Sequence, residues 1–177
     1  MNRYVIITGV AGGGKTTLIN ALRQHGYSCV PEMAREIIAD QLAIGGRALH
    51  QIDPQLFAEV MLSWEIRSYR QAAGLGGVVL FDRGIPDLVG YHRLVGLPVP
   101  PHVLAATSMF RYHPRVFVAP PWPEIHVPDE ERTMGFDEVL RTHEAIASAY
   151  IEHGYEPILL PKVSVAERVE FVRQYLT

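Results

Sequence analysis

Cysteine and long apolar runs are scarce in this chain of 177 residues, and each scarcity excludes a class of protein. The single cysteine, Cys29, leaves no intrachain disulfide, which fits a reducing compartment. No apolar run reaches the roughly 18 residues of a membrane span, and the N-terminus leads into a strand pattern rather than a signal peptide. We therefore expect a cytoplasmic protein with no membrane partner.

Positive charge is also limited, because the formal net charge is −3 and the arginines form no cationic run. This balance excludes strong electrostatic attraction to nucleic acid. Only two lysines occur, Lys15 and Lys162, so a lysine would seldom fall at a motif position by chance. We expect no nucleic-acid partner.

Short apolar runs alternate with helical patterns along the chain. The runs lie at 4–8, 27–30, 78–81, 115–119 and 158–160. Each is followed by helix signals, at 15–25, 32–44 with 53–73, 86–95 with 102–111, 136–153 and 165–176. This alternation predicts a doubly wound α/β fold, with a parallel sheet covered by helices on both faces. At this length we expect residues 1–177 to form one domain.

Residues 9–16, GVAGGGKT, match the phosphate-binding P-loop pattern GxxxxGK[ST] between a predicted strand and a predicted helix. Its glycines let successive N–H groups point at an anion, and the helix N-terminus adds partial positive charge. In this pattern Lys15 contacts the β- and γ-phosphates, and the Thr16 hydroxyl can bind Mg²⁺. The predicted nucleotide contacts are Gly9, Ala11, Gly12, Gly13, Gly14, Lys15, Thr16 and Thr17.

Asp82 follows the most strongly apolar run, at 78–81. In a P-loop protein a carboxylate at this place can bind Mg²⁺, directly or through water, or orient the attacking hydroxyl. Arg83 could hold a phosphate or a substrate in a bidentate contact. The alternatives are a helix cap for Asp82 and a surface ion pair for Arg83. Asp87 is a further candidate for substrate contact, although the helix dipole alone would explain it.

Glu32 and Arg35 lie just beyond the second strand, at a spacing that predicts one helical face. In a small-molecule kinase this place faces the acceptor. The carboxylate could accept a hydrogen bond from the acceptor hydroxyl, and the arginine could hold a polar group. A solvated first helical turn is the alternative interpretation.

The segment 120–135 is proline-rich, charged and aperiodic, and we interpret it as a lid. Arg132 could neutralise charge on a transferred phosphoryl group, although an exposed arginine is the alternative. We expect Trp122 to be a packing anchor rather than a base-stacking residue. Ligands of parallel sheets bind at the carboxyl ends of the strands, so the P-loop, Glu32, Asp82 and this segment should converge.

Together these motifs resemble the P-loop kinase group, and within it the AAA-type predicted ATPases that are grouped with the nicotinamide-riboside-kinase domain of NadR. The matching pieces are 9–17, 31–36, 81–87, 121–125, 129–132 with Phe136, 160–161 and 164–165. The resemblance implies a three-layer α/β/α sandwich with strand order 2-3-1-4-5. It also implies Mg-ATP at the P-loop, adenine around residues 162–165, with Lys162 and Ser164 as contacts, and Arg132 in a lid.

We therefore predict a kinase that transfers the γ-phosphoryl group of Mg-ATP to a hydroxyl of a small, nucleoside-like acceptor. The predicted catalytic residues are Lys15, Asp82, Arg83, Arg132 and Glu32. The predicted metal ligands are Thr16 and Asp82. The predicted acceptor contacts are Glu32, Arg35, Arg83 and Asp87. Either Asp82 or Glu32 could act as the base.

Two alternatives remain open at this point. One is an ATPase or GTPase switch, or a nucleotide-dependent binding module, without a small-molecule acceptor. The absence of an Asn-Lys-x-Asp motif favours ATP over GTP. The other is a polynucleotide kinase, which the acidic charge balance disfavours.

Overall fold

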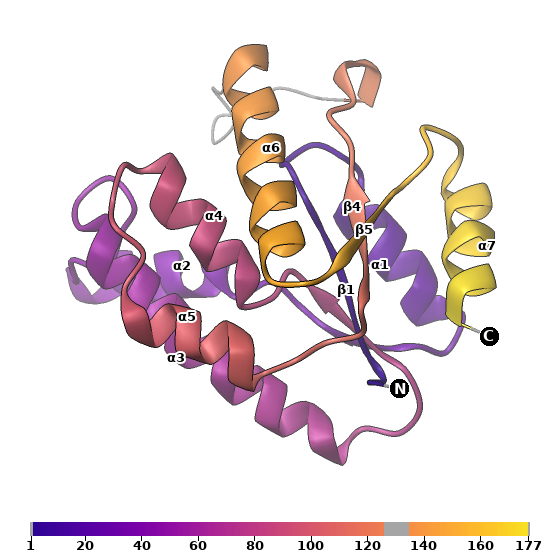
Figure 1. The fold of residues 1–177 in the computed structure, drawn as a ribbon, viewed down its shortest axis with the longest axis horizontal. Coiled ribbons are helices and arrows are strands. Elements are labelled where there is room, and N and C mark those ends of the chain that lie inside the picture. Colours follow the sequence, from indigo (N-terminus) through magenta and orange to yellow (C-terminus); the bar gives the residue numbers. More distant parts are fainter. Residues whose placement is uncertain (1, 126–134, 177) are drawn as a thin grey trace.

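A computed structural model describes residues 2–125 and 135–176, in which a parallel sheet is covered by helices on both faces (Figure 1). The strands are β1 (Tyr4–Gly9), β2 (Ser28–Val30), β3 (Val79–Asp82), β4 (Arg115–Ala119) and β5 (Glu156–Leu159). Their order is β2-β3-β1-β4-β5, and every neighbouring pair is parallel. The predicted α/β/α fold and the kinase-type strand order are both confirmed.

Helices follow the strands as the alternating pattern predicts. They are α1 (Lys15–Gln24), α2 (Ala34–Ile44), α3 (Pro54–Gln71), α4 (Pro86–Leu94), α5 (Pro101–Met109), α6 (Phe136–Glu152) and α7 (Val165–Leu176), with short 3₁₀ helices η1 (Ala72–Gly74) and η2 (Pro123–Ile125). Among the described residues, no helix combines the length and the apolarity that crossing a bilayer requires.

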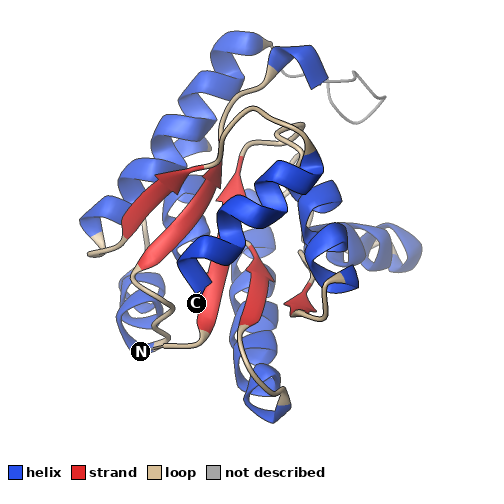
Figure 2. Cartoon of the chain, turned by 90° about the vertical axis from the view of Figure 1, so that its right-hand side faces the viewer, coloured by secondary structure: helices blue, strands red, loops and turns tan. Residues whose placement is uncertain are grey.

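Each central strand buries side chains on both of its faces, which is why its sequence is a continuous apolar run. In β1, Val5 and Ile7 pack with residues of α1 and α7, whereas Tyr4 and Ile6 pack with residues of α6. Figure 2 shows these helices on opposite sides of the strands. Because side chains alternate along a strand, a shift of one residue would exchange the two cores, and burial on both faces therefore specifies the register.

Helix α3 presents a different face to the core from the one that its sequence suggests. The helical spacing of Leu56, Val60 and Trp64 predicts a core stripe, but Leu56 is 41% exposed. The buried residues are instead Phe57, Ala58, Met61, Leu62, Glu65 and Ser68. The predicted stripe was wrong for Leu56, whereas Val60 and Trp64 are half-buried and pack at the margin of the core. Apolar residues occupy two adjacent faces of the helix, and packing against the neighbouring helices buries the second face more deeply.

Helix α2 begins at Ala34, so residues 31–33 precede the helix instead of opening it. The predicted helix start at Glu32 was wrong, and so was the shared helical face of Glu32 and Arg35. The physical reason is an ion pair, since Arg83 Nε lies 2.6 Å from Glu32 Oε1 and holds that residue at the end of the sheet. Glu32 therefore reaches the site from a loop.

Candidate nucleotide and acceptor site

The P-loop joins β1 to α1 at the carboxyl edge of the sheet. Gly9 has a φ of 122°, and a Cβ there would lie 2.4 Å from the carbonyl oxygen of Ala119. Gly14 precedes α1 with a φ of 77°, a conformation that glycine adopts without strain. No side chain caps α1 within the described part of the chain, so the first N–H groups of the helix are available to an anion.

Lys15 is the first residue of α1, and its side chain is buried over the loop. Its ammonium group donates hydrogen bonds to the carbonyl oxygens of Gly9, at 3.0 Å, and Val10, at 2.8 Å. Burial, together with the positive charge of Arg83, lowers the pKa of Lys15 to about 8. A phosphate beside the ammonium would favour its charged form, so anion binding at the loop would raise this pKa.

A cavity of about 880 Å³ brings together residues from both ends of the chain. Its lining falls into three groups by position: Ala11, Gly12, Gly14, Lys15, Thr16 and Thr17 from the P-loop, then Glu32, Arg35 and Arg83, and finally Trp122, Val163, Ser164, Val165 and Arg168. In the strand order the P-loop follows the central β1, the second group follows β2 and β3, and the third follows β4 and β5. The phosphate loop thus lies between two other groups of lining residues.

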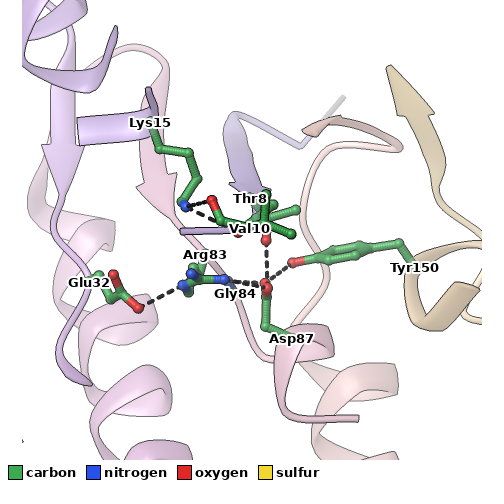
Figure 3. A network of polar contacts seen from close by, with 9 residues as sticks. Thr8, Val10, Lys15, Glu32, Arg83, Gly84, Asp87 and Tyr150 are labelled. Atoms are coloured by element: carbon green, nitrogen blue, oxygen red, sulfur yellow. Dashed lines mark hydrogen bonds and ion pairs between the residues drawn. The ribbon is translucent and has the colours of Figure 1, made fainter. Parts of the chain in front are cut away.

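Arg83 links Glu32 to the start of α4 (Figure 3). Its Nε donates to Glu32 and its Nη1 donates to Asp87 at 3.3 Å. Arg83 also has a φ of 73°, which is strained for a residue with a side chain. Burial raises the pKa of Glu32, but the positive charges of Arg83 and Lys15 outweigh it and hold the pKa below its usual value. Glu32 is therefore ionised at neutral pH, beside a fixed guanidinium.

Asp87 is buried and does not line the cavity. Its carboxylate accepts hydrogen bonds from the Thr8 and Tyr150 hydroxyl groups, the Gly84 N–H and Arg83 (Figure 3). These contacts join β1, the turn after β3 and α6. The structure thus gives the predicted acceptor contact Asp87 a bracing position instead.

We expect Asp87→Asn to lower the free energy of unfolding by about 3 kcal/mol, because one amide cannot satisfy all of these donors. Urea unfolding measures this loss. Asp137→Asn is the matched control, since Asp137 also lies in a first helical turn but is exposed. Unchanged stability combined with lost acceptor affinity would instead favour the substrate contact.

Asp82 ends β3 and is only 9% exposed. Its Oδ1 is buried and has no hydrogen-bond partner among the described residues. Burial raises the pKa of Asp82 to about 6, against the opposing effect of Lys15. Mg²⁺ in nucleotide sites is held by one or two carboxylates together with phosphate oxygens. Thr16 lines the cavity whereas Asp82 does not, and the chemistry of the unpartnered Asp82 oxygen and the Thr16 hydroxyl suits such an ion.

Glu65 is a buried carboxyl that the sequence analysis missed. It lies on α3 and is 4% exposed. Burial raises its pKa to about 8, and the charges of Asp87 and Glu32 add to this rise. Glu65 is therefore protonated at neutral pH. The sequence does contain a signal for its burial, because Glu65 follows the apolar residues at 57, 58, 61 and 62 at helical spacing.

The structure brings one of the two predicted adenine contacts to the cavity and leaves the other outside it. Ser164 lines the cavity, but its hydroxyl donates to Glu167 at 2.6 Å and caps α7. Lys162 is exposed and does not line the cavity. Arg168, which no motif indicated, lies with its guanidinium carbon 4.6 Å from the centroid of the Trp122 ring. Arg132 lies outside the described residues.

Solved structures of kinases share this fold. Deoxyadenosine kinase from M. mycoides, with the products dCMP and dCDP bound, gives a TM-score of 0.71 at 14% identity and covers 98% of both chains. The NadR protein in complex with NR gives a TM-score of 0.73 at 21% identity, covering 99% of this chain and 51% of that one. At these identities the similarity shows the fold.

Curated relatives include nucleotide-binding proteins of Burkholderia cenocepacia and Burkholderia orbicola. Each is 35% identical over 80 aligned residues, which cover 37% of this chain and 26% of the relative. The match thus spans about a quarter of the length of these relatives.

The family comparison covers nearly the whole chain. Residues 4–168 match the AAA domain family AAA_28. The predicted resemblance is thereby confirmed for the family, and the fold is one that deoxyadenosine kinase and NadR share. The chain belongs to the AAA domain family.

Proposed function

We propose that this protein is a kinase that transfers the γ-phosphoryl group of Mg-ATP to a hydroxyl of a small, nucleoside-like acceptor. The observation that carries the proposal is the three-part lining of the cavity. A nucleotide that occupies the P-loop and the group after β4 and β5 leaves Glu32, Arg35 and Arg83 free to contact a second molecule. A solved structure of the same fold is that of a kinase with nucleotide products bound, which supports the proposal.

In this proposal the P-loop holds the phosphates through the N-terminus of α1 and through Lys15. Lys15 exchanges its bonds to the Gly9 and Val10 carbonyl oxygens for phosphate oxygens. A magnesium ion held by Asp82 and Thr16 would neutralise charge on the phosphate oxygens. Phosphoryl transfer requires positioning and charge stabilisation more than covalent chemistry, so this set of groups suffices.

Of the two carboxylates, Glu32 is the better candidate for the catalytic base, and Asp82 is the better candidate for a magnesium ligand. Glu32 lines the cavity and is ionised, so it can accept the proton of an acceptor hydroxyl. Its ion pair with Arg83 fixes the carboxylate, and Arg35 lines the same end of the cavity. We further propose that Arg132 approaches the transferred group from a lid at 120–135.

The function is tested by measuring ADP release from Mg-ATP, first with the protein alone and then with a panel of nucleosides and other small alcohols. Nicotinamide riboside belongs in the panel. A steep rise with one compound, together with isolation of its phosphorylated product, establishes the kinase. A slow rate that no compound changes, with tight ATP binding, would replace the proposal with a switch or binding module.

A further inference from the structure

Arg168 is a buried cation on α7 that no carboxylate accompanies in the described part of the chain. It is 2% exposed. Its Nε donates to the Pro161 carbonyl oxygen at 2.7 Å, and its Nη1 donates to the Gly13 carbonyl oxygen at 2.8 Å. The second bond ties α7 to the P-loop across the sheet edge. Burial lowers the pKa of this guanidinium.

One nitrogen of Arg168 remains without an acceptor. Its Nη2 is buried and has no hydrogen-bond partner among the described residues. Leaving a buried donor unpaired costs free energy, so such a group in a folded protein requires an explanation. Because Arg168 lines the cavity, a small shift of its guanidinium would bring this nitrogen to an acceptor atom of a bound ligand.

The surroundings of Arg168 suit a flat, uncharged ring. The guanidinium covers the ring of Trp122, which is half-buried and also lines the cavity. Val163 and Val165 add aliphatic surface. Stacking on an aromatic ring, aliphatic contacts and one directed hydrogen-bond donor together recognise a nucleobase.

The N-terminus of α7 does not form a second phosphate site. The Glu167 carboxylate accepts hydrogen bonds from the N–H, at 3.1 Å, and the hydroxyl of Ser164. This negative charge already occupies the position that an anion would take at a helix N-terminus. By contrast, α1 has no acidic residue in its first turn. Phosphates are therefore favoured at α1, and an uncharged group is favoured at α7.

We propose that Arg168 reads the base of the bound nucleotide, by donating a hydrogen bond from Nη2 to a ring acceptor of a base that packs beside Trp122. The same side chain contacts Gly13, so one guanidinium links the base end of the cavity to the phosphate loop. This inference rests on the nucleotide site of the proposed function, and it requires no acceptor and no phosphoryl transfer.

Binding measurements separate the base contact from the loop contact. The affinity of the most tightly bound of ATP, GTP, CTP and UTP is compared with that of inorganic tripolyphosphate, by calorimetry with Mg²⁺. Both ligands use the phosphate loop, so any effect of Arg168 on the loop cancels in the ratio of the two dissociation constants. We expect Arg168→Met to reduce the preference for the nucleotide by about tenfold or more.

Arg67→Met is the matched control, because Arg67 also lies over a tryptophan ring, that of Trp64, but is exposed on α3 and away from the cavity. It should leave the ratio unchanged. An unchanged ratio in Arg168→Met would overturn the proposal and leave Arg168 as a brace for the loop. A wild-type protein that binds no nucleotide more tightly than tripolyphosphate would also overturn it.

Two measurements do not depend on the folding of Arg168→Met. The chain has two tryptophans, so Trp64→Phe leaves Trp122 as the sole indole fluorophore. We expect the nucleotide, but not tripolyphosphate, to change its fluorescence. For a purine nucleotide, deaza analogues that replace N1, N3 or N7 by carbon should include one that loses affinity. Full affinity for all of them, with no fluorescence change, would refute the base contact. Kinase activity can fail while these results hold.

Discussion

Lys15→Met should lower the turnover of Mg-ATP by about 10³-fold and leave the protein folded. The ammonium is the positive group of the P-loop that lines the cavity, and it is the group expected to compensate the β- and γ-phosphates. Methionine preserves the buried aliphatic stem of Lys15, which is only 7% exposed, so packing is retained. Steady-state ADP release measures turnover, and circular dichroism reports the fold.

Lys162→Met is the matched control, since Lys162 is the other lysine of the chain and lies exposed outside the cavity. It should turn over ATP within about twofold of the wild type, as expected for a charge that touches no phosphate. Full activity in Lys15→Met would refute the assignment of the phosphate site.

Asp82→Asn should affect activity and stability in opposite directions. Loss of the carboxylate should reduce turnover by roughly 10²-fold or more, with a much smaller change in nucleotide affinity. Without nucleotide or metal, the same substitution should raise the free energy of unfolding at pH 7 by on the order of 2 kcal/mol. Asparagine removes a buried charge whose Oδ1 has no partner among the described residues.

The pH dependence of the Asp82→Asn effect follows from the pKa of Asp82, which folding raises from 3.8 to about 6. Below about pH 4 the carboxyl is protonated whether the chain is folded or unfolded, and the two proteins should be equally stable. Between pH 4 and pH 6 the unfolded chain ionises first, so the wild type loses stability relative to the variant. Above about pH 6 the difference should be constant.

Urea unfolding at pH 4 and pH 7 tests this behaviour. Asp40→Asn, at an exposed position on α2, is the control and should show no such difference. Equal stability of Asp82→Asn and wild type at pH 7, with unchanged turnover, would leave Asp82 as a helix cap. Wild-type turnover should also fall below about pH 6, where Asp82, the carboxylate that we propose as a magnesium ligand, becomes protonated.

The features that the sequence predicts well are those encoded within a short window. The P-loop motif predicts where β1 ends, and the apolar run before Asp82 predicts where β3 ends. Each also identifies the functional residues at the end of its strand. Parallel pairing then places these ends at one edge, so the convergence of the P-loop with Glu32 and Arg83 follows from topology alone.

The missed features depend on contacts between distant segments. The buried face of α3, and with it Glu65, is selected by packing against other helices, because two faces of that helix are apolar. Glu32 lies in the loop before α2, where it pairs with Arg83, which is 51 residues away in the sequence. Arg168 resembles any helical arginine until the fold brings it to Gly13, 155 residues away in the sequence.

The central position of β1 has a consequence for how the protein is made. β1 is synthesised before both of the strands that it pairs with, which are β3 on one side and β4 on the other, where Gly9 pairs with Ala119. At about 5–20 residues per second, the residues between Gly9 and Ala119 take on the order of ten seconds to synthesise. The edge of β1 that pairs with β4 is open to incorrect pairing throughout that interval, and the edge that pairs with β3 is open until β3 has been synthesised, so β1 is a natural client for chaperones. The P-loop therefore becomes part of a complete site only after the lining residues that follow β4 and β5 have been synthesised.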